Sequence, residues 1–274
     1  MTPSLHRPGR VLIIAGSDSG GGAGIQADIK TVTALRGFAT TAVTAITVQN
    51  TLGVTGVHPV PLNMIEAQAR AVLDDLGADA IKTGMLGDAA TVRLVAALLA
   101  QTDAPAVVDP VMVAKGGHAL LADSAIDAVR RDILPQAALL TPNAPEAAVL
   151  TGLLIETTDD LRRAGVRLLE LGARAVLMKG GHIAGEQLVD ILMTPHGETR
   201  FEGARIPTRS THGTGCTLSS AIATGLANGL ELVTAITAAR AYLMGAILNA
   251  PGYGAGHGPL DHGWAMGAAD RPLK

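Results

Sequence analysis

Short apolar runs alternate along the chain with segments whose apolar residues recur every three or four positions. The first run, RVLIIAG at residues 10–16, ends in a glycine-rich turn and predicts a buried strand. Behind it, Ile25, Ile29, Val32 and Leu35 fall on one face of a predicted helix. Further strands are predicted at 40–50, 78–86, 104–112, 137–143 and 173–182, and further helices at 63–76, 89–101, 124–134 and 158–172.

This alternation predicts an α/β fold in which helices cover both faces of a mostly parallel sheet. The rhythm changes at 187–206, where two short runs flank a turn, so we expect a small antiparallel extension at one edge of the sheet. Two helices at 215–229 and 231–248 and a glycine-rich tail at 251–263 follow. No linker or repeat interrupts the chain, and we expect a single domain over residues 1–274.

Composition narrows the class of protein. The chain is 48% hydrophobic but only 2% aromatic, so its core must be built from Ala, Val, Leu and Ile. A net charge of -3 without any basic run argues against nucleic-acid binding. A single cysteine excludes a disulfide within the chain and a multi-thiolate metal site. No apolar stretch approaches the ~20 residues of a membrane span, and no signal peptide is recognised, so we expect a cytoplasmic protein without a membrane partner.

Residues that could bind a ligand or take part in a reaction gather where the predicted strands end. In open parallel sheets, ligands bind outside the carboxyl ends of the strands. A ligand site is therefore predicted at this edge, built from the segments AGSDSGGGAG, TVQN, KTGM, VDPVM, TPNAPE, MKGGH and THGTGC.

The glycine-rich turn after the first strand fits G-x-G-x-x-A at residues 22–27. A dinucleotide-binding turn also requires an acid about 20 residues further on, and residues 40–50 contain neither Asp nor Glu. The dipeptide GK never occurs, which excludes a P-loop. Two interpretations remain: a tight turn between strand and helix, or, as we favour, a loop whose backbone approaches a ligand.

The only cysteine, Cys216, follows Gly213, Thr214 and Gly215 at the predicted start of a helix. Free backbone N–H groups and the helix dipole make such a turn an anion site, and the same dipole would lower the pKa of the thiol. The alternative is a small residue packed at a crowded helix start. Of the eight histidines, only His212, beside this turn, is a candidate for the site, and none shows metal-ligand spacing.

Acidic residues near two other strand ends suggest a magnesium site. Asp109 ends the apolar run AVVDP, and Asn143 and Glu146 follow the strand at 137–143. Oxygen ligands of this kind suit Mg²⁺, which also takes substrate phosphates. A helix N-cap followed by an acid three residues later gives the same pattern, so the cap remains an equal alternative.

Taken together, AGSDSGGGAGIQADIKT, TAITVQNT, KTGML, VVDPVM, TPNAPEAA, LMKGGH and THGTGCTLSSAIA resemble the hydroxymethylpyrimidine/phosphomethylpyrimidine kinases of the ribokinase-like superfamily. The resemblance runs from about residue 11 to 262. It implies a three-layer α/β sandwich acting as an ATP- and Mg²⁺-dependent kinase, commonly a homodimer. Its substrates would be 4-amino-5-hydroxymethyl-2-methylpyrimidine and then the monophosphate of this pyrimidine, in thiamine biosynthesis.

By this likeness Asp28 and Gln49 would bind the pyrimidine, and Met85 and Val111 would be apolar walls. An amide at Gln49 suits the substrate, since its carbonyl can accept from the 4-amino group while its NH₂ donates to the ring nitrogen. The family's first loop often reads D-P-S-G-G where this chain has DSGGG at 18–22, which puts the conformation of that loop in doubt.

The same likeness makes the turn at Gly213 and Gly215 the anion hole and Cys216 the catalytic group. A thiolate there could take the hydroxyl proton as general base, and we favour this role over that of a nucleophile, because direct in-line transfer needs no phosphoenzyme. The nucleotide would contact Asn143, Lys179 and Thr214, and the metal would be supported by Asp109 and Glu146.

Two competing functions stay open. One is a pyridoxal kinase of the same fold. Its substrate presents a phenolic hydroxyl where the pyrimidine has its amino group, so the Gln49 amide would have fewer groups to bind. A non-catalytic ligand-binding protein is disfavoured, because Asp109, Asn143, Glu146 and Cys216 are all present together.

Overall fold

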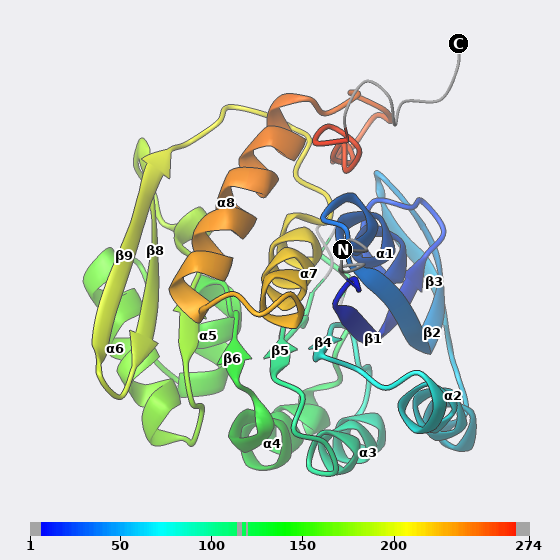
Figure 1. Ribbon diagram of the computed structural model, residues 1–274. Helices are drawn as coiled ribbons and strands as arrows, with labels where there is room; N and C mark the ends of the chain where they lie inside the picture. The colour runs from blue at the N-terminus through cyan, green and yellow to red at the C-terminus, as the bar shows by residue number, and fades with distance from the viewer. Residues whose placement is uncertain (1–6, 114–116, 119, 267–274) are drawn as a thin grey trace, which may run out of the picture.

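A single nine-stranded sheet forms the centre of the molecule (Figure 1). The computed structural model describes residues 7–113, 117–118 and 120–266. In these residues the strand order is β3-β2-β1-β4-β5-β6-β7-β8-β9. The strands are β1 (Arg10–Asp18), β2 (Phe38–Asn50), β3 (Gly53–Pro59), β4 (Ala80–Thr83), β5 (Ala106–Val108), β6 (Leu139–Leu140), β7 (Val176–Met178), β8 (Gln187–Thr194) and β9 (Gly197–Ala204).

Parallel pairing joins β2, β1, β4, β5, β6 and β7, in that order across the sheet, and antiparallel pairing adds β3 at one edge and β8 and β9 at the other. The hairpin predicted at 187–206 is confirmed as β8 and β9. The prediction of one antiparallel edge was incomplete, because β3 pairs antiparallel with β2 at the opposite edge. The sequence of β3, GVTGVHP, contains two glycines and lies largely exposed, so it lacks the apolar alternation by which the other strands were found.

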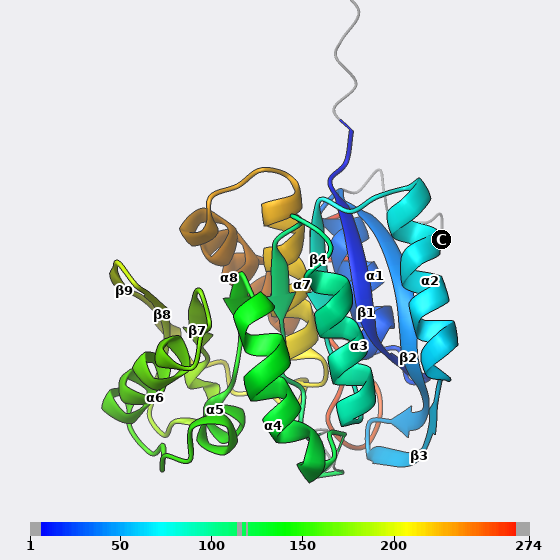
Figure 2. The ribbon, with the colours of Figure 1, turned by 90° about the horizontal axis from the view of Figure 1, so that it is seen from below.

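Helices cover both faces of the sheet, as the alternation predicts. Figures 1 and 2 show α1, α7 and α8 on one face and the helices from α2 to α6 on the other. The principal helices are α1 (Gly24–Ala34), α2 (Leu62–Asp75), α3 (Ala89–Leu99), α5 (Ala144–Thr151), α6 (Thr158–Glu170), α7 (Thr214–Ala227) and α8 (Leu232–Leu248). The predicted three-layer sandwich is thus confirmed.

The helix predicted at 124–134 is irregular. A three-residue α segment, α4 (Ile126–Ala128), is followed by a π turn at Val129–Ile133 and a 3-10 turn at Leu134–Gln136. Pro135 lies in that last turn, where its missing N–H prevents regular α-helical continuation. No helix among the described residues combines the length and the apolarity needed to cross a membrane.

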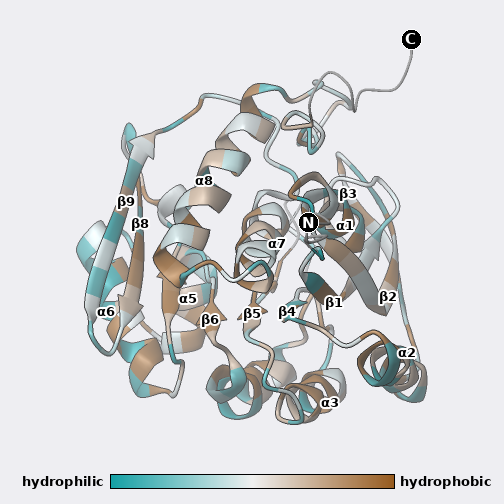
Figure 3. Ribbon diagram, in the orientation of Figure 1, coloured by the Kyte–Doolittle hydropathy of each residue, from teal (hydrophilic) through white to brown (hydrophobic). Residues whose placement is uncertain are grey.

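The apolar core has two halves, one on each face of the sheet. On β1, Leu12 and Ile14 pack toward the side of α2 to α6, whereas Val11 and Ile13 pack toward α1, α7 and α8. Alternate residues of a strand point to opposite faces, so burial on both faces explains the unbroken apolar run. Figure 3 shows the contrast with edge strand β9, which is mostly hydrophilic.

Candidate active site

A cavity of about 720 Å³ lies at the carboxyl ends of the parallel strands. Its walls come from the end of β2, from the loops after β1, β4, β5, β6 and β7, and from the first turn of α7, with further residues from β8 and α8. Every site residue predicted from the sequence lines it except Asp28. The predicted residues in the lining are Gln49, Met85, Asp109, Val111, Asn143, Glu146, Lys179, Gly213, Thr214, Gly215 and Cys216.

The first turn of α7 can form an anion site because its glycines leave the backbone accessible. Gly213, the N-cap residue before α7, has a φ of 80°, a left-handed conformation that glycine adopts without strain. A Cβ on Gly213 would overlap the carbonyl oxygen of Gly22, and one on Gly215 would lie 3.2 Å from an Asp109 oxygen. No side chain described in the structure caps this helix start, and the Thr214 N–H makes only a long contact of 3.5 Å with the Thr211 carbonyl, so the N–H groups of the turn remain able to bind an anion.

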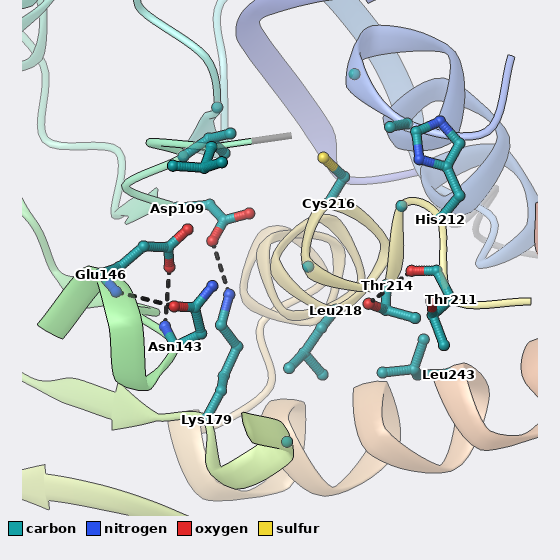
Figure 4. A pocket seen from close by; sticks show the side chains of 18 of the residues that line it. Asp109, Asn143, Glu146, Lys179, Thr211, His212, Thr214, Cys216, Leu218 and Leu243 are labelled. Atoms are coloured by element: carbon teal, nitrogen blue, oxygen red, sulfur yellow. Dashed lines mark hydrogen bonds and ion pairs between the residues drawn. The ribbon is translucent and has the colours of Figure 1, made fainter. Parts of the chain in front are cut away.

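Cys216 lies half-buried on this first turn, and Figure 4 shows it between Asp109 and His212 in that view. Burial raises the pKa of its thiol to about 11; the Lys82 ammonium acts in the opposite direction, while Asp28 and Asp109 add to the rise. The prediction of a thiol with a lowered pKa is therefore wrong. The helix dipole favours thiolate, but the loss of hydration around the sulfur is the larger effect.

A buried ion pair joins two strand ends in the cavity wall (Figure 4). The Lys179 ammonium, after β7, lies 2.9 Å from Asp109 Oδ1, after β5. Burial alone would lower the pKa of Lys179, but the neighbouring carboxylates of Asp109 and Glu146 raise it, so the lysine stays charged. Thr141 Oγ1, 3.2 Å away, also contacts the Asp109 carboxylate. The pair places one fixed cation and one carboxylate beside the first turn of α7, residues 213–216, which we call the anion turn.

Asn143 and Glu146 form a capping box at the start of α5, so the alternative weighed for this pattern is present. The Asn143 side chain accepts from the Glu146 N–H at 2.9 Å, and Glu146 accepts from the Asn143 N–H at 2.8 Å. Capping does not exclude a second role, since both residues line the cavity. Burial raises the pKa of Glu146 to about 7; the Asp109 charge adds to this rise and Lys179 opposes it.

The carboxylates of Asp109 and Glu146 fit a weakly held magnesium ion better than a cage. Among the described residues, no group of three or more His, Cys, Asp or Glu side chains is arranged to hold a metal. Mg²⁺ retains several waters and is commonly bound through one or two carboxylates plus substrate phosphates. The residues present are therefore compatible with Mg²⁺ that arrives with a nucleotide.

The prediction of Asp28 as a substrate ligand needs correction. Asp28 is fully buried, and both of its carboxylate oxygens lie 2.9 Å from the Lys82 ammonium. Ser220 donates a further hydrogen bond of 2.7 Å to the same carboxylate. The side chain is thus occupied behind the cavity wall, whereas Lys82 itself reaches the lining. Lys82 was missed, although a lysine inside an otherwise apolar strand was its signal.

The loop after β1 is tied to the anion turn through Asp18 and His212. His212 Nε2 lies 2.8 Å from Asp18 Oδ2, and both side chains are buried. The Asp18 carboxylate also accepts backbone N–H bonds from Gly20, Gly22 and Ala23. The sequence singled out His212 and the glycine-rich loop separately, but their connection through Asp18 has no sequence signal.

Behind α7, the imidazole of His262 is buried with its Nε2 3.0 Å from Thr217 Oγ1. Burial lowers the pKa of His262 to about 4; Lys30 adds to this effect and Asp261 opposes it. The unfolded chain takes up the proton near pH 6.5, so the folded state loses stability as the pH falls from about 6.5 toward 4.

We expect the free energy of unfolding to fall by roughly 2 kcal/mol between pH 7 and pH 5 on account of His262. Urea unfolding of the wild type and of His262→Gln at both pH values measures this contribution. The glutamine cannot be protonated, so the variant should lose most of the decline. An identical decline in both proteins would contradict the assignment to His262.

Comparisons with known proteins agree with the motifs. The model of the phosphomethylpyrimidine kinase family matches residues 18–261. A hydroxymethylpyrimidine/phosphomethylpyrimidine kinase of Streptomyces coelicolor is 52% identical over 97% of this chain and 98% of its own length. The thiamine biosynthesis bifunctional protein ThiED of Geobacter sulfurreducens is 49% identical over 93% of this chain and 52% of its own.

Similarity extends to solved structures. The ADP complex of Bacillus subtilis pyridoxal kinase matches with a TM-score of 0.86 and 37% identity, over 93% of this chain and 97% of that one. The fold is therefore shared with a pyridoxal kinase, whereas the family match is to the phosphomethylpyrimidine kinases. The chain belongs to the phosphomethylpyrimidine kinase family, as its motifs predict.

Proposed function

We propose that the protein uses Mg²⁺ and ATP to phosphorylate 4-amino-5-hydroxymethyl-2-methylpyrimidine and then its monophosphate, in thiamine biosynthesis and salvage. One observation carries the proposal: the anion turn of α7, the Lys179–Asp109 pair and the Gln49 amide all line one cavity. Family membership supports it, because relatives of nearly full length are hydroxymethylpyrimidine/phosphomethylpyrimidine kinases.

The proposed transfer depends mainly on positioning and charge neutralisation. Backbone N–H groups of Thr214, Gly215 and Cys216 would hold the transferred phosphoryl group. Mg²⁺, supported by Asp109 and Glu146, would neutralise charge on the nucleotide phosphates. Asn143 would support the bound cation through water.

The substrate would lie against Gln49, with Met85 and Val111 as apolar walls. All three line the cavity. Gln49 lies near the end of β2, and its amide is 3.5 Å from Nε2 of His212, the residue directly before the anion turn. Asp28 has no part in this set, because its carboxylate is bound by Lys82 and Ser220.

Lys179 is proposed to contact the nucleotide phosphates. Its ammonium is held at the cavity wall by Asp109, so it meets an anion without a further loss of side-chain freedom. We expect Lys179→Met to raise the KM for ATP about 10- to 100-fold, the equivalent of one charged hydrogen bond of about 1.5–3 kcal/mol. Lys179→Arg, which keeps the charge, is the matched control. An unchanged KM for ATP in Lys179→Met would remove Lys179 from the nucleotide site.

An end-point assay tests the proposed function. Purified protein and Mg-ATP are incubated separately with the hydroxymethylpyrimidine, its monophosphate and pyridoxal, and the products are identified by mass. We expect mono- and diphosphorylated pyrimidine. Phosphorylated pyridoxal with unreacted pyrimidine would instead assign the protein to the activity of the structurally similar pyridoxal kinase. No product from any compound would support a binding protein.

We also propose a cytoplasmic homodimer. Ile46, Val48 and Leu52 are exposed along β2 and the turn that follows it, and Val57 on β3 is more than one-third exposed. An apolar surface of this kind on an edge of the sheet suits contact with a second copy. Light scattering should give twice the 27.8 kDa mass of the chain, and Val48→Lys should shift it to the single-chain mass.

A further inference from the structure

Thr47 and Gln49 are two residues apart on β2 and therefore point to the same side of the sheet. The Thr47 hydroxyl is buried and lies 2.8 Å from the backbone carbonyl of Ser17. One end of the Gln49 amide lies 3.1 Å from the same hydroxyl oxygen. A hydroxyl carries one proton, and a carbonyl can only accept, so the proton of Thr47 is used by Ser17. Toward Gln49, Thr47 can only accept.

The other end of the Gln49 amide lies 3.5 Å from His212 Nε2. This nitrogen is 2.8 Å from Asp18 Oδ2. Burial alone would raise the pKa of Asp18, but hydrogen bonds from His212 and from the loop backbone lower it, so the carboxylate is ionised and can only accept. His212 Nε2 must therefore carry a proton, which Asp18 accepts, so this nitrogen has no lone pair with which to accept from the Gln49 NH₂.

A 180° turn of the terminal amide exchanges its carbonyl oxygen and its nitrogen. In one orientation the carbonyl faces an acceptor at Thr47 and the NH₂ faces a donor at His212, so both contacts are unfavourable. In the other, the NH₂ donates to Thr47 and the carbonyl lies toward the N–H edge of His212, whose proton Asp18 accepts. We infer that Thr47 is a positioning residue that holds the Gln49 amide with its NH₂ toward Thr47 and its carbonyl toward His212.

This orientation sets the order of donor and acceptor that the site offers, a consequence that rests on the proposed function. In the pyrimidine, the 4-amino group is adjacent to the reactive hydroxymethyl group, and ring nitrogen N3 is one atom further away. The hydroxymethyl group must face Cys216, on the turn that begins directly after His212. The amino donor then lies on the His212 side, opposite the Gln49 carbonyl, and N3 meets the remaining N–H.

The 4-oxo analogue of the substrate reverses this pattern, because it carries an acceptor at C4 and an N–H at N3. A fixed amide therefore selects the amino compound, whereas an amide free to turn would accept either. The matched variants are Thr47→Val, which keeps the branched shape without the hydroxyl, and Thr47→Ser, which keeps the hydroxyl.

We expect Thr47→Val to lower the preference for the amino over the oxo compound, measured as the ratio of kcat/KM values, about five- to tenfold. This corresponds to the loss of one neutral hydrogen bond. Most of the change should appear in the KM for the amino compound. Thr47→Ser should retain the wild-type ratio. An unchanged ratio in Thr47→Val, or equal losses for both compounds, would overturn the inference and leave Thr47 a purely structural role.

A second measurement needs no substrate. In the free protein, nuclear Overhauser contacts should join the side-chain NH₂ of Gln49 to the side chain of Thr47, with the signal assigned by its absence in Gln49→Glu. Contacts from this NH₂ to the His212 ring instead of Thr47 would overturn the orientation. A wild type that phosphorylates neither pyrimidine would refute the proposed function, while the Overhauser contacts would still decide the orientation.

Discussion

Replacing Cys216 by alanine is expected to slow the first phosphoryl transfer about 10²- to 10⁴-fold, the usual contribution of a general base. The second transfer should slow by less than about tenfold. The two acceptors differ in their need for a base: the first is a neutral alcohol, whereas the second is a phosphate that is already anionic. Single-turnover rates with the free pyrimidine and with its monophosphate measure the two steps separately.

The pH profile gives this prediction a second readout. Because burial raises the pKa of the Cys216 thiol to about 11, thiolate is scarce at pH 7 and its population rises with pH. The first transfer should therefore accelerate about tenfold per pH unit between pH 7 and 9 in the wild type. In the control variant Cys216→Ser this rise should be absent. Equal losses of both transfers in Cys216→Ala would reject the base role and make Cys216 part of the anion hole.

Lys82→Met is expected to lower the free energy of unfolding by about 3–5 kcal/mol, the cost of removing one partner from a buried ion pair. The methionine has a similar length but leaves the fully buried Asp28 carboxylate with the Ser220 hydroxyl as its one remaining side-chain partner in the described part of the chain. Burial already raises the pKa of Asp28, and Lys82 is the main group that opposes this rise. Urea unfolding followed by circular dichroism gives the difference.

The double variant Lys82→Met/Asp28→Asn provides the matched control. It removes both charges, and the asparagine can still accept from Ser220, so most of the lost stability should return. A fall of less than about 1 kcal/mol in the free energy of unfolding of Lys82→Met would show that the Lys82–Asp28 ion pair is not needed for stability. A double variant no more stable than Lys82→Met would instead attribute the loss to packing around the lysine stem.

Apolar periodicity predicted the order of strands and helices because both faces of the sheet are buried and each element carries its own pattern. It failed on α1, where the expected face included Ile29. That side chain is 38% exposed, whereas its neighbour Asp28 is fully buried. The buried face of α1 is rotated so that Asp28 reaches Lys82, 54 residues away on β4. Local hydrophobicity cannot encode a partner that only the fold brings near.

The residues of the candidate site also fall into those that the sequence could predict and those that it could not. Residues that follow strand ends, such as Asp109 and Lys179, could be predicted because parallel strands end at one edge. Thr47 and Asp18 could not, since their roles depend on the hydrogen bonds they make with other segments. For Cys216, the sequence indicates the dipole of a helix start, but the desolvation that dominates its pKa depends on the surrounding packing.

The close contact between the loop after β1 and the start of α7 limits how this site can change by mutation. A side chain on Gly213 would overlap the Gly22 carbonyl, and a side chain on Gly22 would overlap the His212 ring. The Gly213 overlap is with a backbone atom, so no residue at position 22 can relieve it, and a smaller residue at position 212 would lose the contact of His212 with Asp18. The loop after β1 and the first turn of α7 therefore offer no simple compensating substitution at this contact. A change on either side must move the backbone that holds the reacting groups.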